Sequence, residues 1–336
     1  MGLFKRKKPN LSTEDTVKLQ SVLVRNQRIA IAIGAIVLWS AIGIYFIYRI
    51  NKPLVSTSYY HANIQFRAGD EDSYSEIFEN SLSHIIDMYD RHPNWKWTLE
   101  CQGLLIEMAY ERYSEIFYQM QTMNQRGQME LICPQYSHGL AVAYPYKDFA
   151  ESIQYNKWLM EDVYNFTVSK VIVLQEGQWL PAFPLLNALG FNSIAISRDQ
   201  FSFHNYFPDD PLVEWEFGGQ TGFVIPLNWL PCFEAGVFHH QLMLSDSERS
   251  NTNGKGALET DDEFRYNPEK MRQIERRHIE LERMGNIWMT MEEWVDYCLD
   301  RGDVGVMDKF MPESNWTPNR HQDRKSTRLN SSHRIR

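Results

Sequence analysis

Short apolar runs alternate with longer amphipathic stretches from about residue 58 to residue 302, and the two patterns predict different elements. A short, mostly apolar run between turn residues is typical of a buried strand. Apolar residues that recur every three or four positions predict a helix with one face in a core. The apolar runs predict strands at 58–66, 95–101, 128–134, 170–176, 193–197, 222–227 and 240–246.

Helices are predicted between these strands, and the first of them follows the first strand and stops near Pro93. The last helix is expected to begin at the capping box of Thr290 and Glu293 and to end at Gly302. Repetition of strand and helix favours parallel strands joined by right-handed crossovers, so the pattern predicts an α/β fold, either a β/α barrel or a doubly wound sheet. The other predicted helices are 104–126, 147–166, a short one ending at Gly190, and 267–284.

An uncharged apolar run of twenty residues, Ile29–Tyr48, precedes this region. Such a run is long enough to cross the roughly 30 Å hydrocarbon layer of a bilayer as a helix. A cleaved signal peptide is the alternative, but its apolar region is shorter and its basic arm does not extend to nearly thirty residues. Lys and Arg concentrate before the run, which predicts a cytoplasmic N-terminus and a domain outside the cytoplasm, in a periplasm, on a cell surface or in a lumen.

These patterns divide the chain into five expected parts. The segment DRKSTRLNSSH near the C-terminus resembles the translation of a sequencing adapter, so the last residues are not expected to belong to the fold, and the natural reading frame is expected to continue differently beyond Gln322. The parts are a basic arm (1–28), a transmembrane helix (29–48), a linker (49–56), a barrel domain (57–322) and the adapter-like tail (323–336).

The charge of the expected domain differs strongly from that of its two flanks. Of 34 Lys and Arg, nine lie in 1–56 and five in 323–336; of 43 Asp and Glu, these segments hold two and one. The region between them therefore carries 20 basic and 40 acidic side chains, a net charge of −20. Such a surface repels polyanions, which disfavours nucleic acid as a partner.

Four widely separated cysteines, Cys101, Cys133, Cys232 and Cys298, include no CxxC pair. This spacing disfavours a structural zinc site, and no metal ion or other cofactor is expected. Outside the cytoplasm disulfides are permitted. Because Cys101 and Cys133 lie at apolar strand ends, buried free thiols are at least as well supported.

Polar side chains collect where the predicted strands end. At the C-terminal ends of the strands of a β/α barrel, such side chains build the active site, whereas scattered ones have no such meaning. A core histidine, a glutamate paired with a lysine and a packed tryptophan are the structural alternatives for individual members. The candidates are His61 and Asn63 after the first strand, Glu100 at the end of the second, His138 after the third, Glu176 and Trp179 after the fourth, and Asp246 and Glu248 after a late strand.

Several of these segments together resemble a known family. The order HAN, RGQMELICPQYSHGL, GQWLP, LLNALGF and a late DSE is similar to the N-terminal catalytic region of glycoside hydrolase family 57 over about residues 57–300. The resemblance implies a (β/α)7 barrel acting on α-linked glucans, related in architecture to family 38 α-mannosidases and polysaccharide deacetylases.

The resemblance carries over to only part of the catalytic machinery. Family members have a nucleophilic glutamate directly after a Trp-Leu-Pro or Trp-Leu-Thr segment, and this chain has Ala182 there; Glu176 is the nearest carboxylate. The Asp-x-Glu segment that supplies the acid/base corresponds to Asp246 to Glu248. His61 matches one histidine of a His-x-His segment, and His138 lies where the family places a substrate-contacting histidine.

The chemistry of glycoside hydrolysis decides how these residues are interpreted. Retaining hydrolysis needs two carboxyl groups about 5 to 5.5 Å apart, and inverting hydrolysis about 6.5 to 9.5 Å. We therefore expect a membrane-anchored glycoside hydrolase or transglycosylase that uses Glu176 and Asp246 on a polysaccharide, with the other candidates binding substrate. A catalytically inactive glycan-binding or scaffold protein is the alternative, because Ala182 has no carboxylate. A metal-dependent deacetylase or mannosidase using His61, His138 and Asp246 is a third hypothesis.

Overall fold

The structure, a computed structural model, describes residues 13–50, 54–62, 74–75, 77–137, 145–174, 182–197, 201, 208, 210–227, 236–241 and 268–307. The chain divides into two compact units, Met1–Pro53 and Leu54–Arg336. The first unit contains helix α1 (Thr13–Ile50), in which Gln20–Ile44 is long and apolar enough to cross a membrane. A signal sequence near an N-terminus meets the same criterion of length and composition, so the anchor and its orientation stay predictions.

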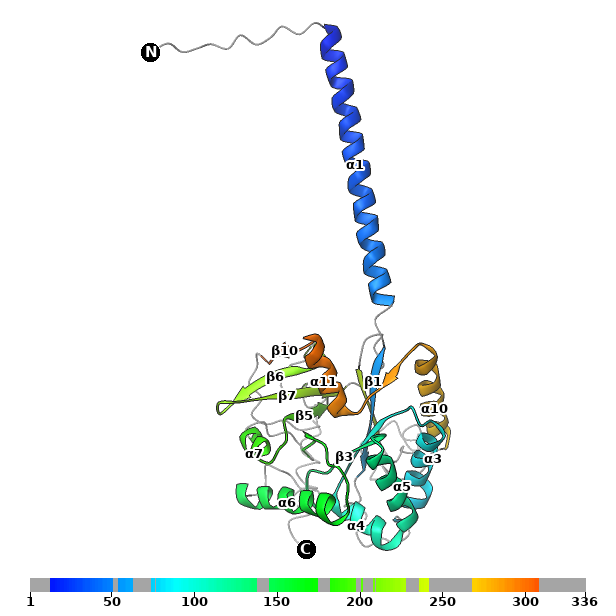
Figure 1. The fold of residues 1–336 in the computed structure, drawn as a ribbon, viewed down its shortest axis with the longest axis vertical. Helices are drawn as coiled ribbons and strands as arrows, with labels where there is room; N and C mark the ends of the chain where they lie inside the picture. Colours follow the sequence, from blue (N-terminus) through cyan, green and yellow to red (C-terminus); the bar gives the residue numbers. More distant parts are fainter. Residues whose placement is uncertain are drawn as a thin grey trace, which may run out of the picture. The chain divides into compact units, whose positions relative to one another are not determined.

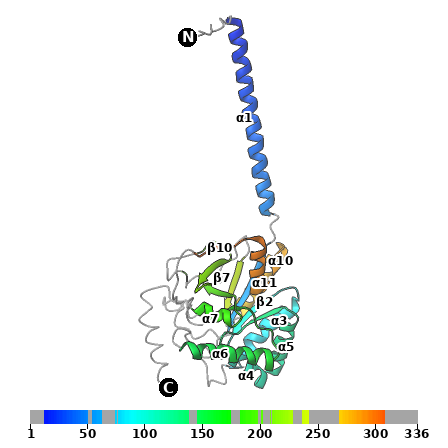
Figure 2. The same ribbon diagram turned by 60° about the vertical axis from the view of Figure 1, so that its left-hand side comes forward.

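Two sheets of mostly parallel strands form the second unit (Figures 1 and 2). In the first sheet β1 (Val55–Ala62) pairs in parallel with β2 (Trp97–Cys101) and β8 (Gly236–Gln241), and β2 pairs with β3 (Met129–Ile132). In the second, β5 (Ser193–Ser197) pairs in parallel with β4 (Val171–Ile172) and β7 (Gln220–Leu227). The short strand β9 (Ile287–Trp288) extends the start of β1.

The two sheets join into one barrel. A parallel bridge between Leu131 and Val168 connects β3 with the approach to β4, and β7 contacts β8 at the other junction. The resulting order, β1-β2-β3-β4-β5-β7-β8, contains seven parallel strands, which confirms the (β/α)7 barrel and excludes the doubly wound sheet. The strand predicted at 240–246 starts earlier than expected, because β8 already begins at Gly236, and residues 242–246 lie outside the described residues.

Two further strands lie outside the barrel order and were not predicted. Strand β6 (Val213–Phe217) pairs antiparallel with β7 through a turn at Gly218 and Gly219, whose φ angles of 61° and 76° suit glycine. Strand β10 (Gly305–Val306) pairs with β6. The alternation in VEWEF followed by GG was the available signal for this hairpin.

The predicted helices are present, but two of them are divided. The stretch 104–126 breaks at Tyr113 into two helices, and 147–166 ends in a π-helical turn, Leu159–Val163. A second π-helical turn, Phe78–Leu82, lies within the first helix of the barrel, after helical residues at Tyr74, Ser75 and Ile77. Among the described residues of this unit the α-helices are α3 (Ser83–Arg91), α4 (Gly103–Arg112), α5 (Ser114–Gln125), α6 (Tyr146–Trp158), α7 (Phe183–Ala188), α10 (Pro268–Arg283) and α11 (Met291–Arg301).

Alternate strand residues face opposite sides of the barrel wall, as the two-residue period of a strand requires. The outward side chains pack against the helices in two hydrophobic clusters. The inward side chains form a third, which helix α11 completes with Met291, Trp294 and Val295. This inner cluster contains Val55, Tyr59, Ile132, Val171, Val173, Ala195, Ile225 and Leu227.

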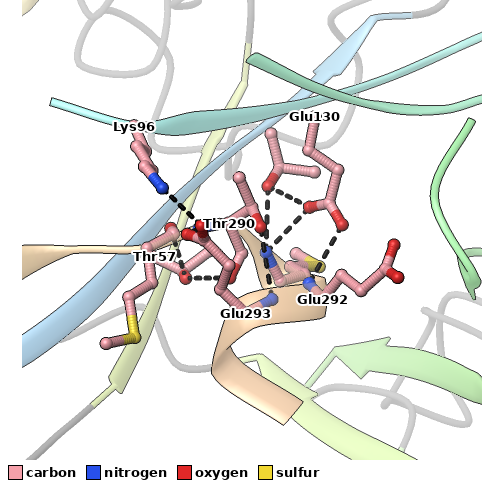
Figure 3. Close-up of polar contacts among 9 residues, drawn as sticks. Thr57, Lys96, Glu130, Thr290, Glu292 and Glu293 are labelled. Atoms are coloured by element: carbon pink, nitrogen blue, oxygen red, sulfur yellow. Dashed lines mark hydrogen bonds and ion pairs between the residues drawn. The ribbon is translucent and has the colours of Figure 1, made fainter. Parts of the chain in front are cut away.

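Helix α11 is held against the starts of the strands by buried polar contacts (Figure 3). The Glu130 carboxylate, in β3, accepts hydrogen bonds from Thr98 Oγ1 (2.6 Å), Ser169 Oγ (2.6 Å) and the backbone N–H groups of Met291 (2.7 Å) and Glu292 (3.0 Å). A carboxylate at a helix N-terminus satisfies N–H groups that have no partner within the helix. The predicted capping box of Thr290 and Glu293 is confirmed, and Gly302 ends the helix at φ 67°.

Candidate active site

The polar residues at the ends of β1 and β2 meet inside the barrel wall. In the parallel register His61 lies opposite Glu100, and Tyr59 precedes His61 by two residues, so all three lie on the inward side. Tyr59 belongs to the inner hydrophobic cluster. The end of the barrel opposite helix α11 therefore has a polar layer directly above an apolar one.

These three side chains form one hydrogen-bonded group. Glu100 Oε2 is in hydrogen-bonding contact with His61 Nδ1 and accepts a hydrogen bond from the Tyr59 hydroxyl at 3.1 Å. The Glu100 side chain is fully buried, whereas the His61 side chain is 20% exposed. Glu100 is therefore placed to orient His61, and His61 is the member of the group that is open to the barrel mouth.

Burial determines the electrostatics of this group. Burial raises the pKa of Tyr59 well above its usual value, and the charge of Glu100 and the hydrogen bond to it raise the pKa further. Tyr59 consequently stays a neutral hydroxyl donor at physiological pH. When His61 donates Nδ1–H to Glu100, this hydrogen bond fixes the tautomer of the ring.

His61 and Glu100 are the two predicted site residues that the structure describes, and it brings them together. Among the described contacts His61 and Tyr59 are the partners of the Glu100 carboxylate, and the alternative of a lysine partner stays a prediction. The structural alternative for His61, a histidine that is hydrogen-bonded to a neighbouring strand, also agrees with this contact. The His61 side chain is nevertheless partly exposed. Asn63, His138, Glu176, Trp179, Asp246 and Glu248 lie outside the described residues.

Ala182, which occupies the expected position of the nucleophile, is fully buried at the start of α7. It belongs to the outward hydrophobic cluster that also contains Phe149, Phe183 and Leu186. The side chain at this position therefore packs among apolar residues. A carboxylate there would have to be accommodated in that apolar environment.

Two important residues were not found from the sequence. Tyr59 lies on the same face of β1 as His61, but an aromatic residue in a strand is expected to belong to the hydrophobic core. Glu130 was treated as part of an apolar strand, and nothing short of the fold brings it to helix α11. Among the described residues no group of three His, Cys, Asp or Glu is arranged to hold a metal ion. This finding does not test the zinc hypothesis, since His138 and Asp246 lie outside that part of the chain.

Comparison with known proteins identifies similar sequences. The profile of Glycosyl hydrolase family 57 matches residues 35–227, which is more than half of the chain. An alpha-amylase of Pyrococcus abyssi is 22% identical over 165 residues, covering 46% of this chain and 24% of the amylase. The chain thus spans about a quarter of the length of this curated relative.

Solved structures share the fold at low sequence identity. The 4-alpha-glucanotransferase of Thermococcus litoralis is 15% identical with a TM-score of 0.57, over 73% of this chain and 38% of that one. The GH57-type branching enzyme of Pyrococcus horikoshii is 11% identical with a TM-score of 0.52, over 79% and 73% of the two chains. These similarities establish the architecture of the barrel.

Proposed function

The chain belongs to glycosyl hydrolase family 57, and we propose on this basis that it is a carbohydrate-active protein that hydrolyses or transfers glycosidic bonds of an α-linked glucan. The observation that supports this proposal most directly is the Tyr59–Glu100–His61 group at the mouth of a (β/α)7 barrel. The C-terminal ends of barrel strands are where enzymes of this architecture bind and react.

His61 is proposed to contact the substrate. Because Nδ1–H is donated to Glu100, a neutral imidazole accepts a hydrogen bond from a sugar hydroxyl at Nε2, whereas an imidazolium donates one there. Glu100 is buried and acts through His61, so we regard it as a positioning residue. Tyr59 in turn supplies a donor that keeps the buried Glu100 carboxylate hydrogen-bonded.

Glu176 and Asp246 are proposed as the carboxylate pair. Glu176 follows Leu174 by two residues at the exit of β4, and Asp246 follows Gln241, the end of β8, by five. Strand β8 pairs with β1 so that Gln241 lies opposite His61. Both segments therefore leave the barrel at the end where His61 lies, which supports a shared site.

In the retaining form of this reaction, one carboxylate attacks the anomeric carbon while the other group gives its proton to the leaving glycosidic oxygen. The resulting glycosyl ester is then cleaved by water, or by the hydroxyl of an acceptor sugar in a transfer reaction. The second group takes the proton of that water or hydroxyl, so the protein returns to its starting state. The Trp179 ring is proposed to stack on a sugar.

The test is release or transfer of sugar from soluble amylopectin by the purified full-length chain. We expect Glu176→Gln and Asp246→Asn each to lower turnover at least about a hundredfold, because each removes a group that participates in bond cleavage. Glu282→Gln, which changes an exposed carboxylate of α10, should retain full turnover. Equal activity of Glu176→Gln and Glu282→Gln would exclude Glu176 from the reaction.

A second candidate is glycan binding without turnover. It is favoured by Ala182, because the position of the family nucleophile is occupied by a methyl group buried among apolar side chains. This candidate predicts no release or transfer from any α-glucan, together with amylopectin binding that His61→Ala weakens. Turnover that Glu176→Gln abolishes would rule it out.

The cellular arrangement is proposed to follow from α1. Its apolar segment would anchor the chain, with the N-terminus in the cytoplasm and the barrel domain on the other side, where a polysaccharide is the expected partner. Alkaline phosphatase fused after Gln322 should be active in bacteria, since this reporter folds only outside the cytoplasm. A fusion that is present in normal amounts but inactive would contradict this orientation and place the barrel domain in the cytoplasm.

A further inference from the structure

Several aromatic side chains lie exposed on neighbouring helices of the barrel wall, away from its interior. Tyr110 on α4, and Tyr155 and Trp158 on α6, are 48%, 47% and 49% exposed. Large aromatic side chains normally bury most of their surface, so three half-exposed rings on adjacent helices require an explanation.

Each of these rings contacts another aromatic ring. Tyr155 lies with its ring centroid 5.7 Å from that of Trp158 and 5.5 Å from that of Tyr136, a partly buried residue that follows β3. Tyr164, buried beneath, lies 5.1 Å from Tyr110. We call the set Tyr110, Tyr136, Tyr155 and Trp158 the aromatic platform.

Carboxylates accompany the platform. The Tyr136 hydroxyl donates a hydrogen bond to Glu107 Oε2, on α4. Burial, followed by the charges of Glu107 and Glu111, raises the pKa of Tyr164 to about 12. Rings with adjacent acceptors match a pyranose, which has an apolar face of C–H groups and a rim of hydroxyl donors.

We propose that the aromatic platform is a second binding site for a neutral polysaccharide chain, separate from the barrel mouth. The inference rests on the proposed function in naming an α-glucan as ligand. A neutral glycan is favoured over an anionic polymer because Glu107 borders the platform and residues 57–322 carry a net charge of −20. One long chain then contacts the protein at two places.

The platform begins beside the candidate active site. Backbone N–H groups of Gly103 and Leu104 donate to the carbonyl oxygens of Gln135 (3.1 Å) and Tyr136 (2.9 Å). These bonds join the segment after β3 to the first turn of α4, which follows β2 and therefore Glu100 directly. We therefore expect a long glucan to extend from the mouth over this edge to the platform.

The test is electrophoresis of the full-length chain in detergent through native gels that contain soluble amylopectin. The dependence of the protein's retardation on the amylopectin concentration gives the dissociation constant. Tyr155→Ala combined with Trp158→Ala is expected to weaken binding about tenfold, the loss of two stacking contacts. The control is Tyr118→Ala, a 55% exposed tyrosine of α5 whose ring contacts Phe117. Its dissociation constant should stay within about twofold of the wild type.

Further variants distinguish the platform from the mouth. His61→Ala should weaken binding of a short maltooligosaccharide while the platform variant binds it as the wild type does. Unchanged amylopectin binding by the platform variant overturns the inference and leaves the proposed function standing. Binding of amylopectin that neither variant weakens would count against both, and stronger retardation by an anionic polygalacturonate gel would contradict a neutral ligand.

Discussion

Glu100 acquires its role from two neighbouring residues on β1. From the sequence it was a carboxylate at the end of a strand, and His61 was a histidine at the end of another. The parallel register places them opposite each other, and strand alternation adds Tyr59 on the same face. Both candidates were thus predictable from strand ends, whereas Tyr59 needed the register, because its aromatic ring fits a core equally well.

Replacing Tyr59 with phenylalanine removes the hydroxyl that donates to Glu100 and keeps the ring. We expect the free energy of unfolding to fall by about 1 to 2 kcal/mol, since a buried carboxylate loses a donor. Urea denaturation measures the change. Tyr118→Phe, on an exposed side chain, should change it by less than about 0.5 kcal/mol. Equal stability of the two variants would mean that the hydrogen bond to Glu100 contributes nothing.

Most of the elements follow from local sequence, and the failures have specific physical causes. The amphipathic period located helices α10 and α11 to within about two residues, and in α11 the capping residues agree with the apolar face. The period does not detect the break at Tyr113, since both helices continue the same apolar face into the first core cluster. Strand β6 was not predicted because it forms a hairpin with β7, which departs from the alternation of strand and helix along the barrel.

A glycine inside β7 is required by packing. A Cβ atom built on Gly222 would lie 1.6 Å from Cζ of Phe183, which belongs to the second core cluster. We expect Gly222→Ala to lower the free energy of unfolding by about 2 to 3 kcal/mol, because the buried ring must shift. Gly127→Ala is the matched control: its φ of 71° is strained for alanine but the Cβ meets no atom within 4 Å, so a loss of about 1 kcal/mol is expected in urea denaturation. A smaller loss for Gly222→Ala than for Gly127→Ala would contradict the packing argument.

Glu130 joins strand β3 to helix α11, and its titration should be visible in stability. Burial raises the pKa of Glu130 above the usual 4.5, while its four hydrogen bonds act in the opposite direction. A raised folded-state pKa means that the folded chain binds the proton more tightly. The contribution of Glu130 is then complete below about pH 4.5 and decreases as pH rises through the raised pKa.

Glu130→Gln tests this linkage. The amide places an N–H group against backbone donors of α11, so we expect a loss of about 2 kcal/mol in the free energy of unfolding at pH 7. The difference from wild type should be larger at pH 5 than at pH 7, measured by urea denaturation at both. The control is Glu282→Gln, which changes an exposed carboxylate of α10, the helix before α11 in the sequence. Its free energy of unfolding should equal that of the wild type at both pH values. A stability difference between wild type and Glu130→Gln that is smaller at pH 5 than at pH 7 would mean that folding lowers the pKa of Glu130 and does not raise it.

At the scale of the whole molecule, the family and the barrel were predictable because they depend on many residues at once. The carboxylate pair depends on Glu176 and Asp246, and neither the family pattern nor the described strands determines where their side chains lie. The family pattern supplies no nucleophile here because Ala182 occupies its position. Glu176 lies six residues earlier, and the place of its side chain depends on the loop conformation, which the strand pattern does not encode.

The division into two units predicts that the barrel does not depend on α1 for its stability. Leu54–Arg336 has its own three core clusters, and all of their members lie at or beyond Leu54. A chain that begins at Leu54 should therefore unfold in urea with a free energy within about 0.5 kcal/mol of that of the full-length chain in the same detergent.

The same deletion should move the protein from the floating membrane fraction to the supernatant, because α1 holds the apolar segment Gln20–Ile44. Scrambling residues 1–12 serves as control and should leave the protein with the membranes. Loss of cooperative unfolding on deletion would show that residues before Leu54 complete the domain, and retention on membranes would locate the anchor elsewhere in the chain.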